Sequence, residues 1–341
     1  MNIYVLFFLS ILLFSGCINF EQRNEVAQLS GSYNYEFYKN HIEDYKLTTV
    51  AHWAHGKISD VLLSNPANPK QSDSQFLKEA LWRLKNPSQT EPHQDYVAPE
   101  FARLAWRAIQ VIDWTHKLHE QLYDIMADSK IAPDEKKYWI DRAVDYYLSE
   151  PDVAFSPAPF EEVVMKRVKL MRQPWFKSFR NHWPQTIELF WIFHWWHPVV
   201  YETQILFPGS EAQRKAILKV NELFFDKALL TPTNRMLLSR EVMPRFSNLS
   251  PESANIFDNL HMFHGVVYDI LASPKVEDKR KEIYKIIDLM VVRPGDRTLA
   301  QNFPTPHPEF DPLGYPLWLK KGSGEMGRIM GHAMNISHEV K

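Results

Sequence analysis

Apolar residues recur three and four positions apart along most of the chain, and short proline-containing segments interrupt this pattern. Such periodicity is typical of helices that bury one face. Glycine is scarce, at 11 residues, and proline is common, at 23, which favours helices with proline at their boundaries. The pattern therefore predicts an all-α fold, with helices over about residues 41–63, 73–85, 99–128, 133–150, 160–173, 184–207, 210–231, 250–270 and 277–292.

One arrangement of histidines, a hydroxyl residue and an acid occurs four times along these helices. Two histidines three residues apart are followed four residues later by Tyr or Ser, and then directly by Asp or Glu. The copies at 113–125 and 258–270 also share an Asp three residues before the first histidine. The four copies contain His52, His55 and Asp60; His116, His119, Tyr123 and Asp124; His194, His197, Tyr201 and Glu202; and His261, His264, Tyr268 and Asp269.

The copies return at a nearly constant interval, 142 residues from His52 to His194 and 145 residues from His116 to His261. A fixed internal period indicates a repeated architecture. We therefore predict a bundle or array of helical hairpins from four repeats, in which a two-hairpin module is duplicated about a pseudo-twofold axis. The predicted boundaries are a signal peptide at 1–16, a tether at 17–40, a first module at 41–160, a second module at 161–298 and a Pro- and Gly-rich extension at 299–341, with 41–341 forming one compact domain.

The spacing within each copy points to metal binding. At about 100° per residue, the second histidine lies roughly 60° from the first on the helix surface, and the acid lies roughly 80° to the other side. Facing helices that carry such stripes can surround a metal ion, as the cores of helical bundles do. Random placement of 14 histidines predicts about half a His-x-x-His pair, whereas four occur. We therefore predict that the eight histidines and four acids of the copies are metal ligands.

Other residues of the copies are expected beside these ligands. Asp113 and Asp258 fall on the same stripe, either as ligands or as groups that orient imidazole N–H bonds. Tyr123, Tyr201 and Tyr268 can hydrogen-bond ligands, support redox chemistry or simply pack in the core. The alternative to the whole metal hypothesis is a helical repeat whose buried histidines bond to carbonyls or acids.

The N-terminus has the pattern of a signal peptide, with an apolar run over 3–14 that is too short to span a bilayer comfortably. The junction Leu13-Phe14-Ser15-Gly16-Cys17 resembles the lipobox of bacterial lipoproteins. This resemblance implies cleavage before Cys17 and attachment of a lipid such as palmitate to its thiol. Because Ile18 rather than Asp follows, it also implies the outer membrane, with the protein facing the periplasm or the exterior. The alternative is an uncleaved N-terminal anchor.

Composition excludes several other classes of protein. A formal net charge of −2 gives no reason to expect a nucleic-acid partner. Cys17 is the only cysteine, so intrachain disulfides, iron–sulfur clusters and multi-thiolate zinc sites are excluded. The sequence has no Gly-x-Ser-x-Gly elbow and no phosphate-binding glycine loop. The expected partners are therefore a membrane, through the lipid, and metal ions, while the sequence identifies no protein partner.

Together these features predict a lipid-anchored, extracytoplasmic metalloprotein. The leading hypothesis is a non-haem metal-dependent oxidoreductase with iron, or else copper or zinc, since imidazole with carboxylate suits these metals. Two dinuclear sites are expected, which pair the first copy with the second and the third with the fourth, or the first with the third and the second with the fourth. The alternatives are a storage or delivery protein for iron, copper or zinc, a dinuclear zinc hydrolase, and a protein that binds haem non-covalently.

Overall fold

The structure, a computed structural model, describes residues 35–64, 67–233, 235–301 and 311–315. Over these residues the chain is mainly helical and forms no β-strand, which confirms the predicted all-α class. The α-helices are α2 (Tyr35–Asn40), α3 (Ile42–Leu63), α4 (Pro69–Lys85), α5 (Gln94–Val97), α6 (Pro99–Leu104), α7 (Trp106–Ala127), α8 (Lys136–Leu148), α9 (Pro184–Leu206), α10 (Ser210–Leu223), α11 (Ser239–Val242), α12 (Pro244–Leu249), α13 (Pro251–Ala272), α14 (Lys279–Met290) and α15 (Asp296–Ala300).

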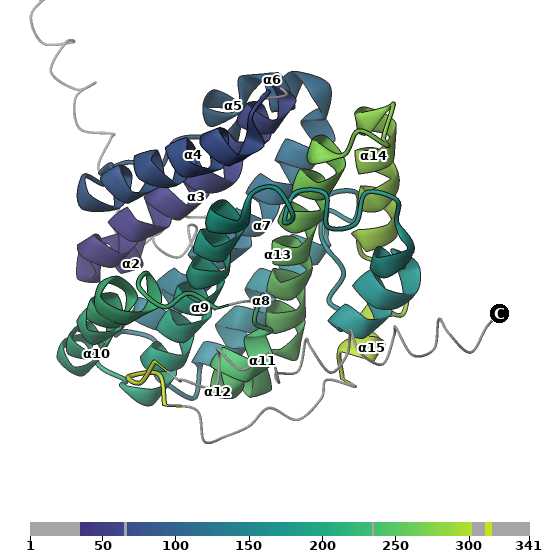
Figure 1. Ribbon diagram of the computed structural model, residues 1–341. Coiled ribbons are helices and arrows are strands. Elements are labelled where there is room, and N and C mark those ends of the chain that lie inside the picture. Colours follow the sequence, from purple (N-terminus) through teal and green to yellow (C-terminus); the bar gives the residue numbers. More distant parts are fainter. Residues whose placement is uncertain (1–34, 65–66, 234, 302–310, 316–341) are drawn as a thin grey trace, which may run out of the picture.

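Four long helices, α3, α7, α9 and α13, form the centre of the molecule (Figure 1). Each is 22 or 23 residues long, which corresponds to about 33 Å at 1.5 Å per residue. Helices α3 and α7 each pack against both α9 and α13, so that α3 lies diagonally across the bundle from α7, and α9 from α13. Each histidine copy lies on one of these four helices.

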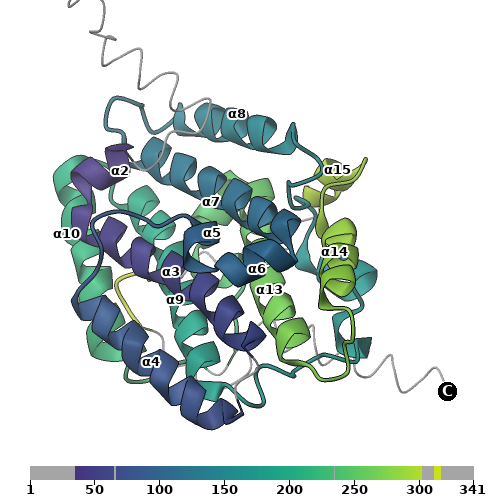
Figure 2. The same cartoon turned by 90° about the horizontal axis from the view of Figure 1, so that it is seen from above.

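The remaining long helices cover the outside of this bundle (Figure 2). Helices α4 and α10 pack on α3 and α9, whereas α8 and α14 pack on α7, and α14 also packs on α13. The outer helices bury one face only. Helix α14, for example, buries Ile283, Ile286, Ile287 and Met290, at the spacing of three and four that predicts a helix. The central helices are thus largely enclosed, and the faces that they turn toward one another are kept from water.

The helix boundaries agree with the sequence prediction at some points and differ at others. At the start of α13, Ser250 Oγ accepts the Ser253 backbone N–H and Pro251 is the first helical residue, as predicted. The predicted helix over 99–128 is instead two helices, α6 and α7, because Ala105 is non-helical, with φ −143° and ψ 68°. The segment 160–173 forms a π-helical turn over Glu161–Arg167 and a 3₁₀ turn over Leu170–Arg172, not one α-helix.

The predicted tether over 17–40 ends within the folded domain. Residues Tyr35–Asn40 form α2, where Phe37 is fully buried and its ring stacks on Tyr123 at a centroid distance of 4.5 Å. The compact domain therefore begins before residue 41. The predicted signal peptide, Cys17 and most of the predicted extension over 299–341 lie outside the described residues. Within the described ranges, no helix combines the length and apolar character needed to cross a membrane.

Candidate metal centre

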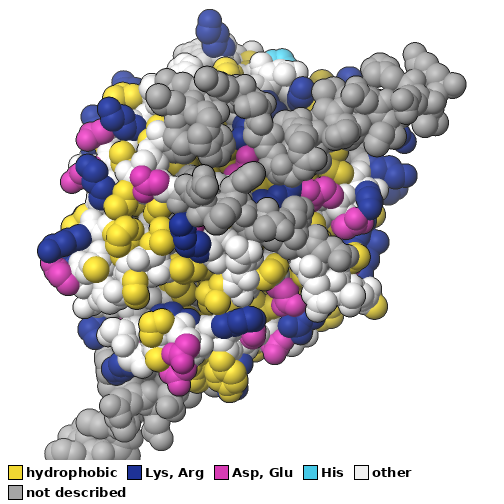
Figure 3. All heavy atoms as spheres, turned by 90° about the horizontal axis from the view of Figure 1, so that it is seen from below, with side chains coloured by type: hydrophobic (Ala, Val, Ile, Leu, Met, Phe, Trp, Pro, Cys, Tyr) yellow, Lys and Arg dark blue, Asp and Glu magenta, His cyan; other side chains and the backbone are white. Residues whose placement is uncertain are grey.

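The eight predicted histidines meet in the interior of the four-helix centre. Each has at most 5% of its surface exposed, so none is a surface residue. On the face drawn in Figure 3, the histidine colour appears only at one edge. The buried residues are His52, His55, His116, His119, His194, His197, His261 and His264. Four helices thus bring together residues that lie up to 212 positions apart in the sequence, counted from His52 to His264.

The imidazole rings contact one another in a regular way. The first histidines of diagonally placed helices are in contact across the bundle. The rings of His52 and His116 are stacked with centroids 3.9 Å apart, and those of His194 and His261 are tilted by 32° with centroids 4.0 Å apart. The second histidines pair between adjacent helices, at 4.4 Å for His55 and His264 and 5.0 Å for His119 and His197. Further contacts of 5.8 to 6.0 Å join these pairs. The copies therefore form one connected cluster, rather than either of the two pairings that the sequence suggested.

Several of these imidazoles have no hydrogen-bond partner within the described part of the chain. His55, His194 and His264 lack a partner at both ring nitrogens. A buried donor or acceptor without a partner costs about 1–3 kcal/mol, and each neutral imidazole carries one of each. Burial also lowers the pKa of all three well below its usual value. The rings are thus neutral, with lone pairs free to bind a metal ion.

Two groups of described residues have the geometry to hold a metal ion. Ring nitrogens of His55, His116 and His264 lie within 4.8 Å of one another, and the same holds for His52, His116 and a carboxylate oxygen of Glu91. Three or four imidazole and carboxylate ligands are the usual set for zinc, iron or copper. The structure therefore contains His and Glu groups that could hold a metal ion, which is the coarser part of the prediction. His116 belongs to both groups, which places the two candidate positions side by side.

Carboxylates gather at one side of the cluster. Glu91, from the loop between α4 and α5, contacts Nδ1 of His52 through one oxygen, and its other oxygen is buried without a partner. Burial and the neighbouring Glu91 raise the pKa of Glu120 well above its usual value, and raise that of Asp113 to about 6. Like charges this close favour a shared proton or a cation. We call this set of His52, Glu91, His116 and Glu120 the carboxylate end.

Neither glutamate was among the predicted ligands. Glu120 stands four residues after His116 and so falls on the same helix face, which is a signal that the sequence already contained. Glu91 lies in a loop, between helices α4 and α5, where no periodicity points to a direction. Only the fold brings it to His52.

The four acids that end the copies have another role. Each carboxylate accepts hydrogen bonds from two backbone N–H groups at the start of a neighbouring segment. Asp60 accepts from Glu100 and Phe101, Asp124 from Tyr35 and Phe37, Glu202 from Arg245 and Phe246, and Asp269 from Lys177 and Phe179, at N···O distances of 2.8 to 3.3 Å. These are capping interactions. The structure thus places none of the four acids in the two candidate groups, contrary to the prediction that they are ligands.

The three tyrosines support the cluster from outside. Tyr123 donates to the backbone carbonyl of His197, Tyr201 to that of His119 and Tyr268 to that of His55, at 2.8 to 3.0 Å. Tyr201 Oη also lies 3.0 Å from His119 Nδ1. The tyrosines therefore fix the second histidine of each partner helix, and burial raises the pKa of all three well above its usual value.

Asp258 does not share the position of Asp113. One of its oxygens accepts hydrogen bonds from the backbone N–H and the hydroxyl of Ser239, at 2.9 and 2.8 Å. It holds the start of α11 and belongs to neither candidate ligand group. Only Asp113 of this predicted pair lies close to the carboxylates of the cluster.

Another side of the cluster is mostly apolar. A cavity of about 30 Å³ there is lined by His55, His194, His261 and His264 together with Ile187, Phe190, Trp191, Met236, Met262, Gly265, Tyr268 and Arg180, whose guanidinium pairs with Asp269. We call His194, His261, Met236 and Gly265 the apolar end. A space of this size holds roughly one water-sized group.

Comparison of the chain with protein-family models, with curated proteins and with solved structures gives no match. The functional argument therefore rests on the geometry of the cluster.

Proposed function

We propose that this protein is a metalloprotein whose eight-histidine cluster holds a multinuclear transition-metal centre. The observation that carries the proposal is the set of three buried imidazoles with no partner at either ring nitrogen. Without a ligand, each would leave polar atoms unsatisfied in a low-dielectric interior. An ion shared by several neutral imidazoles would satisfy these atoms.

We propose further that the centre serves a non-haem oxidoreductase, with iron the first candidate and copper or zinc the others. A bound redox metal would supply the electron transfer. The access route is a cleft of about 910 Å³ whose wall includes Glu91, Trp53, Arg83 and Tyr96. Glu91 connects this wall with the interior, because it lines the cleft while its carboxylate contacts His52. It is therefore the residue that would position His52 and carry a proton between the cluster and a substrate in the cleft.

The alternatives differ in how well they fit. Haem fits poorly, because the cavity at the histidines has a volume of about 30 Å³ and the paired rings, with centroids 3.9 and 4.0 Å apart, leave no slot for a macrocycle between them. A storage or delivery protein would share the same ligands, but it needs no cleft beside them. A zinc hydrolase would share the cleft, and the identity of the metal distinguishes it.

We also propose that the fold is a duplicated module with pseudo-twofold symmetry. Equivalent elements are separated by constant steps, 142 residues from α3 to α9 and 145 residues from α6 to α12 and from α7 to α13. The capping interactions follow the same steps, because Asp60 and Glu202 cap α6 and α12, and Asp124 and Asp269 bind the equivalent segments at 35–37 and 177–179. Independent hairpins would have no reason to keep these distances.

The proposed location is the bacterial cell envelope, with the chain anchored through lipid on Cys17. The lipobox resemblance supports this proposal. Labelling of cells with a palmitate analogue tests it: the wild-type chain should incorporate label and Cys17→Ala should not. Incorporation by the variant would contradict the proposal.

The decisive experiment for the metal centre is elemental analysis with an absorption spectrum, on protein purified without a histidine tag. We expect more than one transition-metal ion per chain. His264→Gln and His116→Gln should each lower this content, whereas His182→Gln should not, because His182 is exposed and only contacts the carbonyl of Ser178. An unchanged metal content in both cluster variants, with helix content intact by circular dichroism, would refute the proposal.

A further inference from the structure

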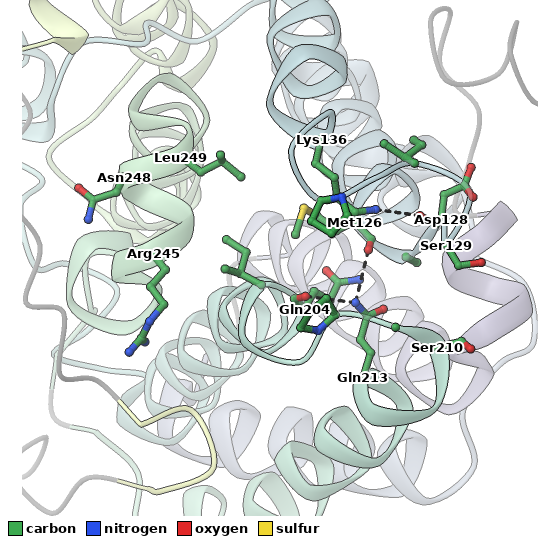
Figure 4. Close-up of a pocket in the computed structure, with 16 residues that line it drawn as sticks. Met126, Asp128, Ser129, Lys136, Gln204, Ser210, Gln213, Arg245, Asn248 and Leu249 are labelled. Carbon is green, nitrogen blue, oxygen red and sulfur yellow. Dashed lines mark hydrogen bonds between the residues drawn. The ribbon is translucent and has the colours of Figure 1, made fainter.

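The molecule has a further pocket, partly open to solvent, that the histidine cluster does not touch. A cavity of about 600 Å³ lies where α7 and α9 end and α10 begins, with α12 on its far side (Figure 4). None of the eight histidines lines it. Met126, in its wall, stands seven residues after His119, or about 10 Å further along the helix. A space of this size is typical of small-molecule sites.

Most of the wall is apolar, and its charged groups are already engaged. Apolar side chains are supplied by Met126, Ile131, Ile205, Pro208 and Leu249, among others. Lys136 donates to the backbone carbonyls of Ile125 and Asp128, at 2.6 and 2.8 Å. Arg245 binds the carboxylate of Glu202 at 2.7 Å. The charged wall residues thus have protein partners and do not define the ligand.

Gln204 is the exception. It is only 2% exposed, and neither the nitrogen nor the oxygen of its side-chain amide has a hydrogen-bond partner among the described residues. Figure 4 shows this side chain beside Gln213 and below Met126. Gln213, by contrast, donates to the backbone carbonyls of both Met126 and Gln204. One buried amide in the wall is thus satisfied by the protein and the other is left with a free donor and a free acceptor.

The fold itself does not require an amide at this position. The residue 142 positions earlier, at the equivalent place in α3, is Leu62, which is buried. A leucine would fill the site without unsatisfied polar atoms, whereas a buried amide without hydrogen-bond partners destabilises the fold. The cost is recovered when a ligand supplies the missing partners.

We propose that this cavity binds a small molecule with an apolar body and a carboxamide- or lactam-type edge. Such an edge places an N–H and a C=O side by side, and so pairs with both atoms of the Gln204 amide. A carboxylate would leave the Gln204 oxygen without a donor. A purely apolar ligand would leave both atoms unpaired.

Cyclohexanecarboxamide is a suitable probe, and its N,N-dimethyl derivative is the matched control, because that derivative cannot donate a hydrogen bond. Titration followed by calorimetry should give a Kd for the carboxamide at least tenfold lower than for the dimethyl compound, since a buried unpaired group costs about a factor of ten or more. Equal affinity of the two compounds, or no binding of either one, would overturn the proposal.

The variant Gln204→Leu separates ligand binding from folding. Because Leu62 occupies the equivalent position, we expect this variant to fold with an unchanged or higher melting temperature and with the metal content of the wild type. In this variant the carboxamide and its dimethyl derivative should bind with about equal Kd. If the variant keeps the tenfold preference, Gln204 does not recognise the ligand and the assignment is wrong. Leu249→Trp, which reduces the cavity, should weaken the binding of both compounds.

Discussion

The carboxylate end and the apolar end of the cluster occupy corresponding positions in the two proposed modules, yet their chemistry differs. A step of 145 residues relates Glu91 to Met236 and Glu120 to Gly265. The same step relates His116 to His261, and both histidines contact the ring of a partner histidine, with centroids 3.9 and 4.0 Å apart. The histidine scaffold is thus shared, while the groups around it have diverged.

This difference indicates which end should hold metal most tightly. Carboxylates add negative charge and hard oxygen ligands, which favour di- and trivalent iron, manganese or zinc. The apolar end offers neutral imidazoles with a thioether nearby, a set that favours softer ions. We therefore expect hard ions to bind first at the carboxylate end, and the following experiments test this asymmetry.

The largest expected effect comes from removing the carboxylates. In Glu91→Gln with Glu120→Gln, the affinity for one ion of iron(II) or zinc should fall by at least 10–100-fold, the range seen when supporting groups alone are lost. Glu79→Gln is the matched control, because Glu79 lines the same cleft but pairs with Arg83 at the surface. Competition with a chelator measures the affinity. An equal loss in the control would mean that the cleft, and not the cluster, binds the ion.

Adding carboxylates to the apolar end should create a site for a hard metal ion there. A side chain can start at Gly265 without a clash, because a Cβ added there meets nothing within 4 Å. Gly265→Glu together with Met236→Glu should raise the number of tightly bound hard ions by one per chain, as counted by elemental analysis after chelator treatment. Gly265→Gln with Met236→Gln keeps the size without the charge and should bind no extra ion. If both pairs of substitutions behave alike, charge does not explain the difference between the ends.

Removing the acids that accept backbone hydrogen bonds should lower the free energy of unfolding, by a similar amount in both proposed modules. Asp124→Ala and Asp269→Ala each leave two backbone N–H groups without an acceptor, which costs about 1–3 kcal/mol. Urea denaturation should show this loss in the free energy of unfolding for both variants. The metal content of the folded protein should stay unchanged, because neither carboxylate belongs to a candidate ligand group. Loss of metal at wild-type stability would restore these acids as ligands.

The capping acids also show how far the sequence could predict the site. Periodicity placed eight histidines on inward stripes, because a helix face follows from spacing alone. The same spacing put each acid at the edge of its stripe, roughly 140° from the second histidine. Whether an acid at such an edge binds a metal ion or accepts backbone hydrogen bonds depends on the segment that packs against it. Here backbone N–H groups pack against each acid, and only the tertiary structure brings them there. Glu91 was not predicted for a similar reason, because it lies in a loop without hydrophobic periodicity.

The smallest expected difference concerns the tyrosines behind the second histidines. Tyr201→Phe and Tyr268→Phe each remove a hydrogen bond to a histidine carbonyl, at 2.8 and 3.0 Å, so that each should lower the free energy of unfolding by about 1 kcal/mol. Tyr201 alone also lies at hydrogen-bond distance from a ring nitrogen, Nδ1 of His119. Its loss should therefore weaken metal binding by a few-fold as well, since a group that orients a ligand tunes its affinity, whereas Tyr268→Phe should leave metal affinity unchanged. Equal metal affinities in the two variants would mean that the tyrosines act on the backbone only, and that the two ends differ solely in their carboxylates.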